Sequence, residues 1–189
     1  YAPISYELSL GGKRIRPVMM LMAYNMYRDD VDKILDPALA LEIYHNFTLL
    51  HDDLMDNADV RRGKPTVHKR WDANTAILSG DVMLSLADVY MSRVDDEYFR
   101  KVITTFHRTS IEIAEGQQYD MDFETRSDVT EAEYVEMIRL KTSVLLACAL
   151  KIGAILGGAS EDDATHLYRL GECIGLAFQL RDDYLDVYG

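Results

Sequence analysis

The sequence predicts an all-α protein, a single-domain bundle of long antiparallel helices, and three observations support this. No segment alternates polar and apolar residues with the period of two that strands require. The turn-forming clusters between apolar segments are short. The chain has 189 residues, of which 48% are hydrophobic, which fits one domain with a substantial core.

Helix boundaries follow from capping and turn residues. Gly11–Pro17 is a glycine-led loop, with Pro17 suited to the first turn of a helix. Asp36 and Asp72 are expected to cap the next two helices, and Thr130 begins a capping box with a glutamate three residues later. A loop covers 61–65, and Ser160 opens the last helix. The predicted helices cover about 17–28, 37–56, 73–94, 96–123, 130–157 and 160–186.

Bulk properties exclude some classes of partner. The net charge of −12 argues against a nucleic-acid partner. The longest apolar stretch, 144–159, is interrupted by Lys151, so we expect no membrane span. Cys148 and Cys173 lie in helical apolar patterns, which indicates buried thiols in a reducing compartment. Residues 1–4 lack the features of a signal peptide, so a cytoplasmic location is expected.

Two aspartate clusters have the same spacing. Asp52 and Asp56 are four residues apart and share a helix face, whereas Asp53 lies to the side. Two carboxylates on one face repel each other unless a cation lies between them, and Mg²⁺ suits one or two carboxylates plus phosphate oxygens. The pattern returns near the end of the chain, and its members are Asp182, Asp183 and Asp186.

Basic residues stand at helix entries or within an apolar helix. Each alone fits a solvated surface position, but with two aspartate clusters they indicate a site for one or two diphosphates. His45 lies two helical turns before Asp52 on the same face, and His51 is expected either to support the neighbouring aspartates or to have a structural role. The basic set is Lys13, Arg16, Arg61, Arg62 and Lys141.

These motifs resemble those of the trans-isoprenyl diphosphate synthases, also called polyprenyl synthetases. The first aspartate cluster with its trailing Arg-Arg-Gly and the second cluster after Phe178 both match. Five motifs stand in the family's order along nearly the whole chain. They cover Gly11–Pro17, His51–Gly63, Gly116–Asp120, Lys141–Thr142 and Phe178–Asp186.

The resemblance implies a helical bundle around a central cavity and head-to-tail condensation of isopentenyl diphosphate with an allylic diphosphate, which is dimethylallyl, geranyl or farnesyl diphosphate. It implies three Mg²⁺ ions, with Asp52, Asp56 and Asp182 as principal ligands and Asp53, Asp183 and Asp186 completing the clusters. Arg61 and Lys141 would bind the allylic diphosphate. Thr142 and Gln179 would direct oxygen atoms at the developing carbocation. The isopentenyl diphosphate site would comprise Lys13, Arg16, His45 and Arg62.

Chain length depends on the helix that precedes Asp52. Phe47 lies five residues earlier, roughly 7–8 Å deeper at the rise of an α-helix, with the smaller Thr48 at four. In relatives an aromatic residue at the fifth position limits growth, which implies a short-chain product, C20 geranylgeranyl or C15 farnesyl diphosphate. Phe47 as ordinary core, and contributions from Ser79, Met83 and Leu86, stay open, as does a medium- or long-chain product.

Two further functions are compatible with a helical protein that carries these clusters. A terpene cyclase shares the fold but usually has a different second metal motif, and a non-catalytic regulatory subunit typically loses aspartates. Helices that are apolar nearly all round indicate either a multilayer bundle or a subunit interface, so a homodimer is expected. Compared with the family, residues 1–189 are expected to form one domain that lacks the usual N-terminal helix and C-terminal helices.

Overall fold

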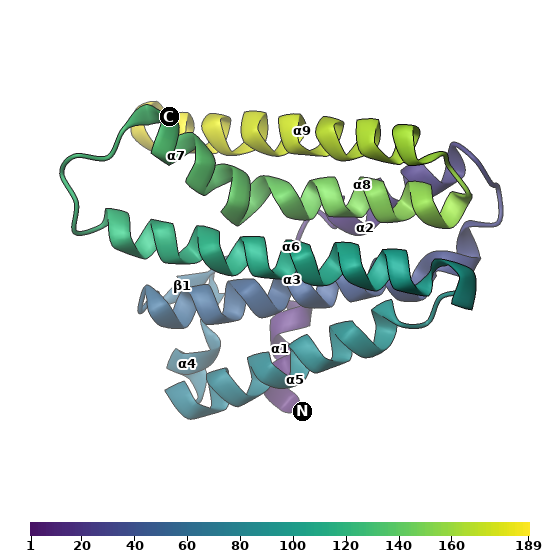
Figure 1. Ribbon diagram of the computed structural model, residues 1–189. Coiled ribbons are helices and arrows are strands. Elements are labelled where there is room, and N and C mark those ends of the chain that lie inside the picture. The colour runs from purple at the N-terminus through teal and green to yellow at the C-terminus, as the bar shows by residue number, and fades with distance from the viewer. The chain divides into compact units, whose positions relative to one another are not determined.

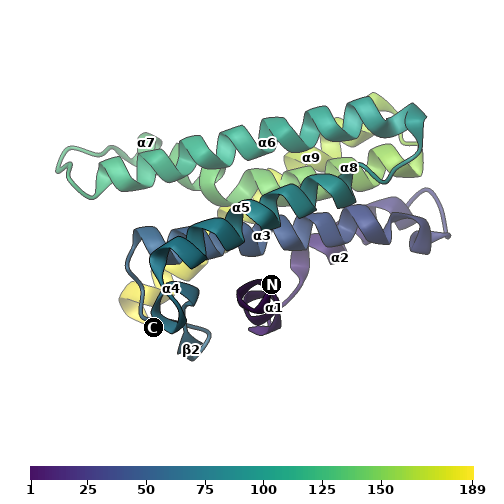
Figure 2. The ribbon, with the colours of Figure 1, turned by 90° about the horizontal axis from the view of Figure 1, so that it is seen from below.

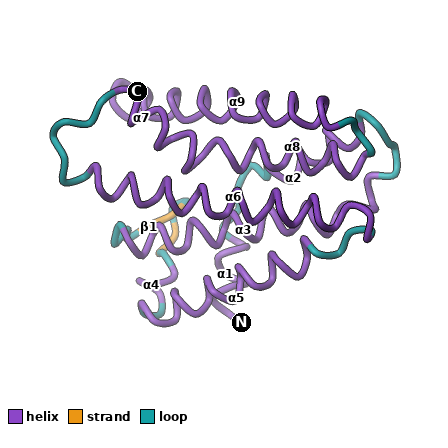
Figure 3. Tube along the Cα trace, in the orientation of Figure 1, coloured by secondary structure: helices purple, strands orange, loops and turns teal.

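The computed structural model describes residues 1–189 and is mainly helical (Figure 1). Loops join the helices, and the strands are limited to two of two residues each (Figure 3), so the predicted all-α class is confirmed. The elements are α1 (Ala2–Ser9), α2 (Ile15–Asn25), the 3-10 helix η1 (Val31–Ile34), α3 (Leu35–Met55), β1 (Val60–Arg61), β2 (Lys64–Pro65), α4 (Val67–Arg70), α5 (Ala73–Met91), α6 (Asp96–Phe123), α7 (Glu131–Ile138), the π-helical segment η2 (Arg139–Ser143), α8 (Val144–Gly157) and α9 (Glu161–Tyr188).

The chain divides into two compact units. The first contains Tyr1–Pro17 and Leu35–Val94, and the second contains Val18–Ile34 and Asp95–Gly189. The first unit therefore carries the first aspartate cluster, and the second unit carries the second. The expectation of one domain stays a prediction.

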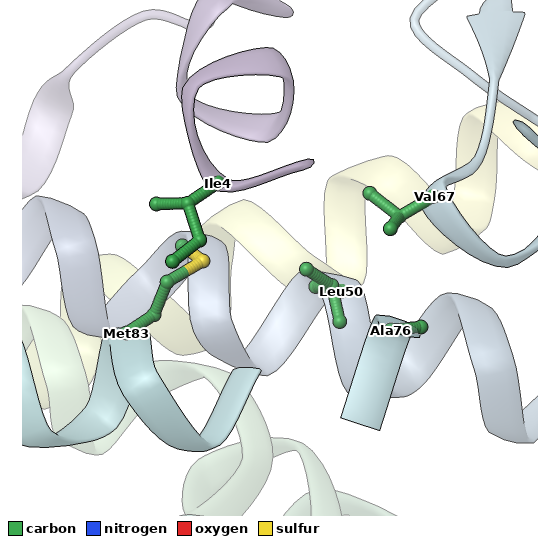
Figure 4. Packing of buried hydrophobic residues seen from close by; sticks show 5 residues of the cluster. All are labelled: Ile4, Leu50, Val67, Ala76 and Met83. Carbon is green, nitrogen blue, oxygen red and sulfur yellow. The ribbon is translucent and has the colours of Figure 1, made fainter. Parts of the chain in front are cut away.

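In the first unit, α3 packs along α5, while α1 and α4 contact both helices (Figure 2). Figure 4 shows the apolar cluster that joins these elements. Side chains from helices far apart in the sequence meet there, so burial of apolar area fixes α1 and α4 against the α3–α5 pair. The buried members are Ile4, Leu50, Val67, Ala76 and Met83.

Local signals set most boundaries in this unit. Asp72 caps α5 as predicted, because its side chain accepts the amide of Thr75 at 2.9 Å. The helix ends at Met91, slightly before the predicted boundary. The prediction that Asp36 caps α3 is wrong. The 3-10 helix η1 leads directly into Leu35, so Asp36 lies inside the first turn.

Two features of the first unit were not expected. The chain forms helix α1 over Ala2–Ser9, with a proline in its first turn. The predicted 61–65 loop is a hairpin in which Arg61 pairs with Lys64. Its two central residues, Arg62 and Gly63, have φ values of 53° and 76°, the left-handed conformation of a tight two-residue hairpin turn.

In the second unit, α8 packs against both α6 and α9, and the three run side by side (Figures 1 and 2). Both predicted caps are confirmed, because Thr130 forms a capping box with Glu133 and Ser160 accepts the amide of Asp163 at 3.1 Å. The predicted 130–157 helix is continuous, but η2 widens it at Arg139–Ser143. Such π-turns often occur at functional positions.

The helical run Glu131–Gly157 is long and apolar enough to cross a membrane by length and composition. However, 83% of its most apolar window is buried inside the fold, as expected of a core helix. Cys148 lies in this core. Cys173 is exposed on α9, so the prediction that both thiols are buried is wrong for Cys173.

Candidate functional site

The first aspartate cluster lies at the C-terminal end of α3. The Asp56 amide donates to the Asp52 carbonyl at 2.9 Å, so the helical turn continues through both residues. Their carboxylates therefore lie one turn apart on one face. Asp56 is exposed and Asp52 is partly exposed, whereas Asp53 is only 2% exposed. The first and last aspartates are thus the accessible pair of this cluster.

The middle aspartate is bound by an arginine of the hairpin. Nε and Nη2 of Arg61 both lie 2.7 Å from Asp53 Oδ1, and Nη2 lies 3.6 Å from Asp52 Oδ2. Burial raises the pKa of Asp53, and the Arg61 bond opposes that rise. The other oxygen, Oδ2, is buried without a hydrogen-bond partner. This geometry favours Asp52 and Asp56 over Asp53 as metal ligands, and it fixes the Arg61 guanidinium beside them.

The hairpin turn also brings Arg62 to the glycine-led loop. Its guanidinium donates to the Gly11 carbonyl. A Cβ at Gly12 would lie 3.0 Å from Arg62 Nη2, and Gly12 has a φ of 132°, so both space and backbone conformation favour glycine. Lys13 follows on the same exposed loop. Residues about fifty positions apart in the sequence are therefore adjacent.

The charges of four arginines act on His45. Burial and these positive charges lower the pKa of His45 to about 2, so the imidazole is neutral at physiological pH. Burial lowers the pKa of Arg16 to about 10, although the negative charge of Glu42 opposes this change. The guanidinium therefore stays charged at physiological pH. Four of the predicted diphosphate-binding residues, Arg16, His45, Arg61 and Arg62, are thus brought together. The arginines that act on His45 are Arg14, Arg16, Arg61 and Arg62.

Sequence reasoning missed Glu42, the acidic partner of this basic cluster, and Asn46, which binds Glu42. Arg14 forms an ion pair with Glu42 and donates to the Leu8 carbonyl at 3.0 Å. Asn46 Nδ2 donates to Glu42 Oε1 at 2.9 Å. Glu42 and Asn46 are four residues apart on the otherwise apolar face of α3. This pair of polar residues could have indicated a buried polar contact from the sequence.

Glu7 on α1 was also missed. Its side chain is fully buried, and neither carboxylate oxygen has a hydrogen-bond partner. Burial and the charge of Asp53 raise its pKa to about 7, with Arg61 and Arg62 opposing. No sequence signal marked this residue, because helix α1 itself was not expected.

Phe47 lies on α3, where its ring makes edge contacts with Tyr44 and His51 at centroid distances of 5.5 and 4.8 Å. It is partly buried against the apolar cluster of the first unit. The Thr48 hydroxyl donates to the His45 carbonyl at 2.8 Å. The role of Phe47 in limiting the chain length of the product stays a prediction.

In the second unit, η2 presents Lys141 and Thr142. Lys141 Nζ lies 2.6 Å from Asp120 Oδ2, so two of the matched motifs meet. The Thr142 hydroxyl donates to Gln179 Oε1 at 3.1 Å. A Cβ at Gly116 would lie 2.4 Å from the Lys141 backbone nitrogen, so a glycine on α6 permits this close approach.

In the second aspartate cluster the middle aspartate is again bound by side chains of the protein, but its partners are uncharged and it is only half-buried. Gln179 Nε2 donates to Asp183 Oδ1 at 2.8 Å, and the Tyr134 hydroxyl donates to Asp183 Oδ2. Burial and this bond raise the pKa of Tyr134 to about 12. Asp182 and Asp186 lie one turn apart on α9. Tyr134 was missed because it is 49 residues from its partner.

The donor set fits Mg²⁺ bound jointly with a phosphorylated ligand. Within residues 1–189, no group of three or more acidic, histidine or cysteine side chains is close enough to hold a metal by itself. Each unit instead offers a carboxylate pair, with the middle aspartate bound to protein donors. Mg²⁺ commonly uses one or two carboxylates and completes its shell with phosphate oxygens and water.

Comparison with known proteins agrees with these motifs. The polyprenyl synthetase family model matches residues 1–189. A geranylgeranyl diphosphate synthase of Methanosarcina mazei is 48% identical over 99% of this chain and 58% of its own length. A short chain isoprenyl diphosphate synthase of Methanothermobacter thermautotrophicus is 45% identical over 95% of this chain and 56% of its own.

A crystal structure of a geranylgeranyl pyrophosphate synthase superposes with a TM-score of 0.97 at 53% identity. The match covers 100% of this chain and 58% of the solved one, so the chain spans well under two thirds of these relatives. The family model and the relatives agree over nearly every residue of the chain, which therefore belongs to the polyprenyl synthetase family.

Proposed function

We propose that the protein containing this chain is a Mg²⁺-dependent prenyltransferase. It would condense isopentenyl diphosphate head-to-tail with an allylic diphosphate to form a short-chain all-trans product, C15 or C20. The observation that carries the proposal is the repeated carboxylate pair, in each unit accompanied by basic side chains. The names of the relatives support the reaction class.

The carboxylates would bind substrate through metal ions, and the basic side chains would bind it directly. Asp52 and Asp56, and separately Asp182 and Asp186, would hold the metal ions, which neutralise a diphosphate and make it a better leaving group. Arg61 would bind a diphosphate oxygen from the position in which Asp53 holds it. A guanidinium fixed in advance stabilises developing charge without reorganising during the reaction.

The neutral His45 and the charged Arg16 and Arg62 would bind the second diphosphate. At a pKa of about 2, His45 can donate a hydrogen bond but adds no positive charge. In the second unit, Gln179 Oε1 and the Thr142 oxygen would face the growing cation. The bond between them fixes both groups, and Asp183 fixes the Gln179 amide.

We also propose a homodimer in the cytoplasm. Exposed apolar residues at positions 18, 22 and 26 follow helical spacing along α2 and just beyond its end, and association would cover them. The two free thiols suit a reducing compartment. Light scattering of the purified protein tests the dimer directly.

Activity with labelled isopentenyl diphosphate and each allylic primer, with Mg²⁺ or EDTA, tests the function. Metal-dependent C15 or C20 alcohols after dephosphorylation are expected. Much longer products would support the proposed reaction but contradict the proposal that Phe47 limits chain length. A folded full-length protein that elongates no primer would contradict the proposal and favour a cyclase or a regulatory subunit.

A further inference from the structure

Helix α5 has a glycine at the point where His51 of α3 reaches it. A Cβ at Gly80 would lie 2.1 Å from His51 Nε2 and 2.5 Å from its Cδ2, distances that real atoms do not adopt. The imidazole Nε2–H donates to the Ile77 carbonyl of α5 at 3.3 Å. The missing side chain at Gly80 therefore allows the ring to lie against the α5 backbone.

The same imidazole contacts Phe47. The two rings are one helical turn apart on α3, with centroids 4.8 Å apart and planes inclined by 67°. This is the edge-to-face geometry that aromatic pairs prefer. Tyr44 contacts the Phe47 ring one turn earlier on the helix, at 5.5 Å. The Phe47 ring is thus held between two aromatic neighbours, and one of these is fixed by the α5 backbone.

We propose that His51 and Gly80 are positioning residues that set product chain length by holding the Phe47 ring in place. The inference rests on the proposed function and on Phe47 as the floor of the space for the growing tail. Without His51 behind it, the ring gains rotational freedom and the floor yields to a longer tail. Neither His51 nor Gly80 needs to contact substrate for this effect.

A double-mutant cycle in thermal unfolding tests the contact without using activity. Gly80→Ala alone should lower the Tm by roughly 3–4 °C, because the new methyl group displaces the imidazole from the Phe47 ring and from the Ile77 carbonyl. In the His51→Ala background the same substitution should lower the Tm by less than about 2 °C, because the colliding ring is gone. Ser85→Ala, at an exposed position on α5, is the matched control and should change neither value.

Product analysis then tests the consequence. His51→Ala and Gly80→Ala should each raise the share of products longer than the main one by roughly two- to tenfold, the range set by losing one aromatic pair. The Ser85→Ala control should keep the original distribution. The double variant should resemble His51→Ala, because both substitutions act through the same ring.

The outcomes separate this inference from the proposed function. Active variants with an unchanged product distribution would overturn the positioning role and leave the prenyltransferase proposal intact. An equal Tm loss from Gly80→Ala in both backgrounds would also overturn it, because the glycine would then serve helix packing alone. If the unsubstituted protein elongates no primer, the proposed function fails and the inference fails with it, whatever the unfolding cycle shows.

Discussion

Glu7→Gln should make the protein more stable at neutral and alkaline pH. The Glu7 carboxylate is fully buried, and neither oxygen has a hydrogen-bond partner. Ionising such a group is unfavourable because no water or donor compensates the charge, and the nearby charge of Asp53 adds to the cost. Glutamine has nearly the same shape and stays neutral at every pH.

The magnitude follows from the pKa. Folding raises the pKa of Glu7 from 4.5 to about 7, so the folded protein binds this proton more tightly than the unfolded chain. The contribution to stability is therefore complete below pH 4.5 and is lost as the pH rises through 7. At about 1.4 kcal/mol per pKa unit, the shift corresponds to roughly 3 kcal/mol.

Urea unfolding followed by far-ultraviolet circular dichroism between pH 4 and 8 measures this effect. The two proteins should be similarly stable at the acid end, and Glu7→Gln should exceed the unsubstituted protein by up to about 3 kcal/mol at the alkaline end. Glu115→Gln, at an exposed position on α6, is the control and should show no such divergence. Parallel stability curves for Glu7→Gln and the unsubstituted protein would refute the reasoning.

Four further substitutions test the two units. Asp52→Ala and Asp182→Ala should each lower turnover at least about 100-fold while circular dichroism stays unchanged, because each removes one carboxylate of a proposed metal-binding pair; near-normal rates in both would refute the metal assignment. Phe47→Ala should shift products to longer chains in the primer assay, and an unchanged spectrum would place the floor elsewhere. Arg61→Ala should lower the free energy of unfolding by about 3 kcal/mol, because it leaves Asp53 buried without its partner; Arg61→Ala combined with Asp53→Asn should recover part of this loss, and no recovery would mean that the ion pair is not the cause.

Features that depend on short-range geometry could be predicted from the residues alone. The caps at Asp72, Thr130 and Ser160 each join residues three positions apart, so they could be inferred without a fold. The carboxylate pairs follow in the same way from four-residue spacing on a helix. The order of five motifs was sufficient to identify the family, which the family model confirms.

Short-range sequence rules failed to predict three features of the backbone. An aspartate before a proline predicted a cap at Asp36, but the 3-10 helix η1 carries the chain into α3 one residue earlier. The two-residue hairpin at Arg62–Gly63 required a left-handed arginine, which few sequence patterns anticipate. The π-turn at Lys141 leaves no mark in the apolar periodicity that predicted one helix.

The pairing of the clustered charges, in contrast, depends on long-range packing and could not be predicted. Asp53 and Asp183 resemble their neighbouring aspartates in sequence, but Arg61 binds one and Tyr134 the other. Burial and distance determine these partners, and both depend on how segments far apart in the chain pack together. The pKa of Glu7 and the contact of His51 with Gly80 arise in the same way. Glu7 on α1 is affected by the charge of Asp53 on α3, and His51 on α3 lies against Gly80 on α5.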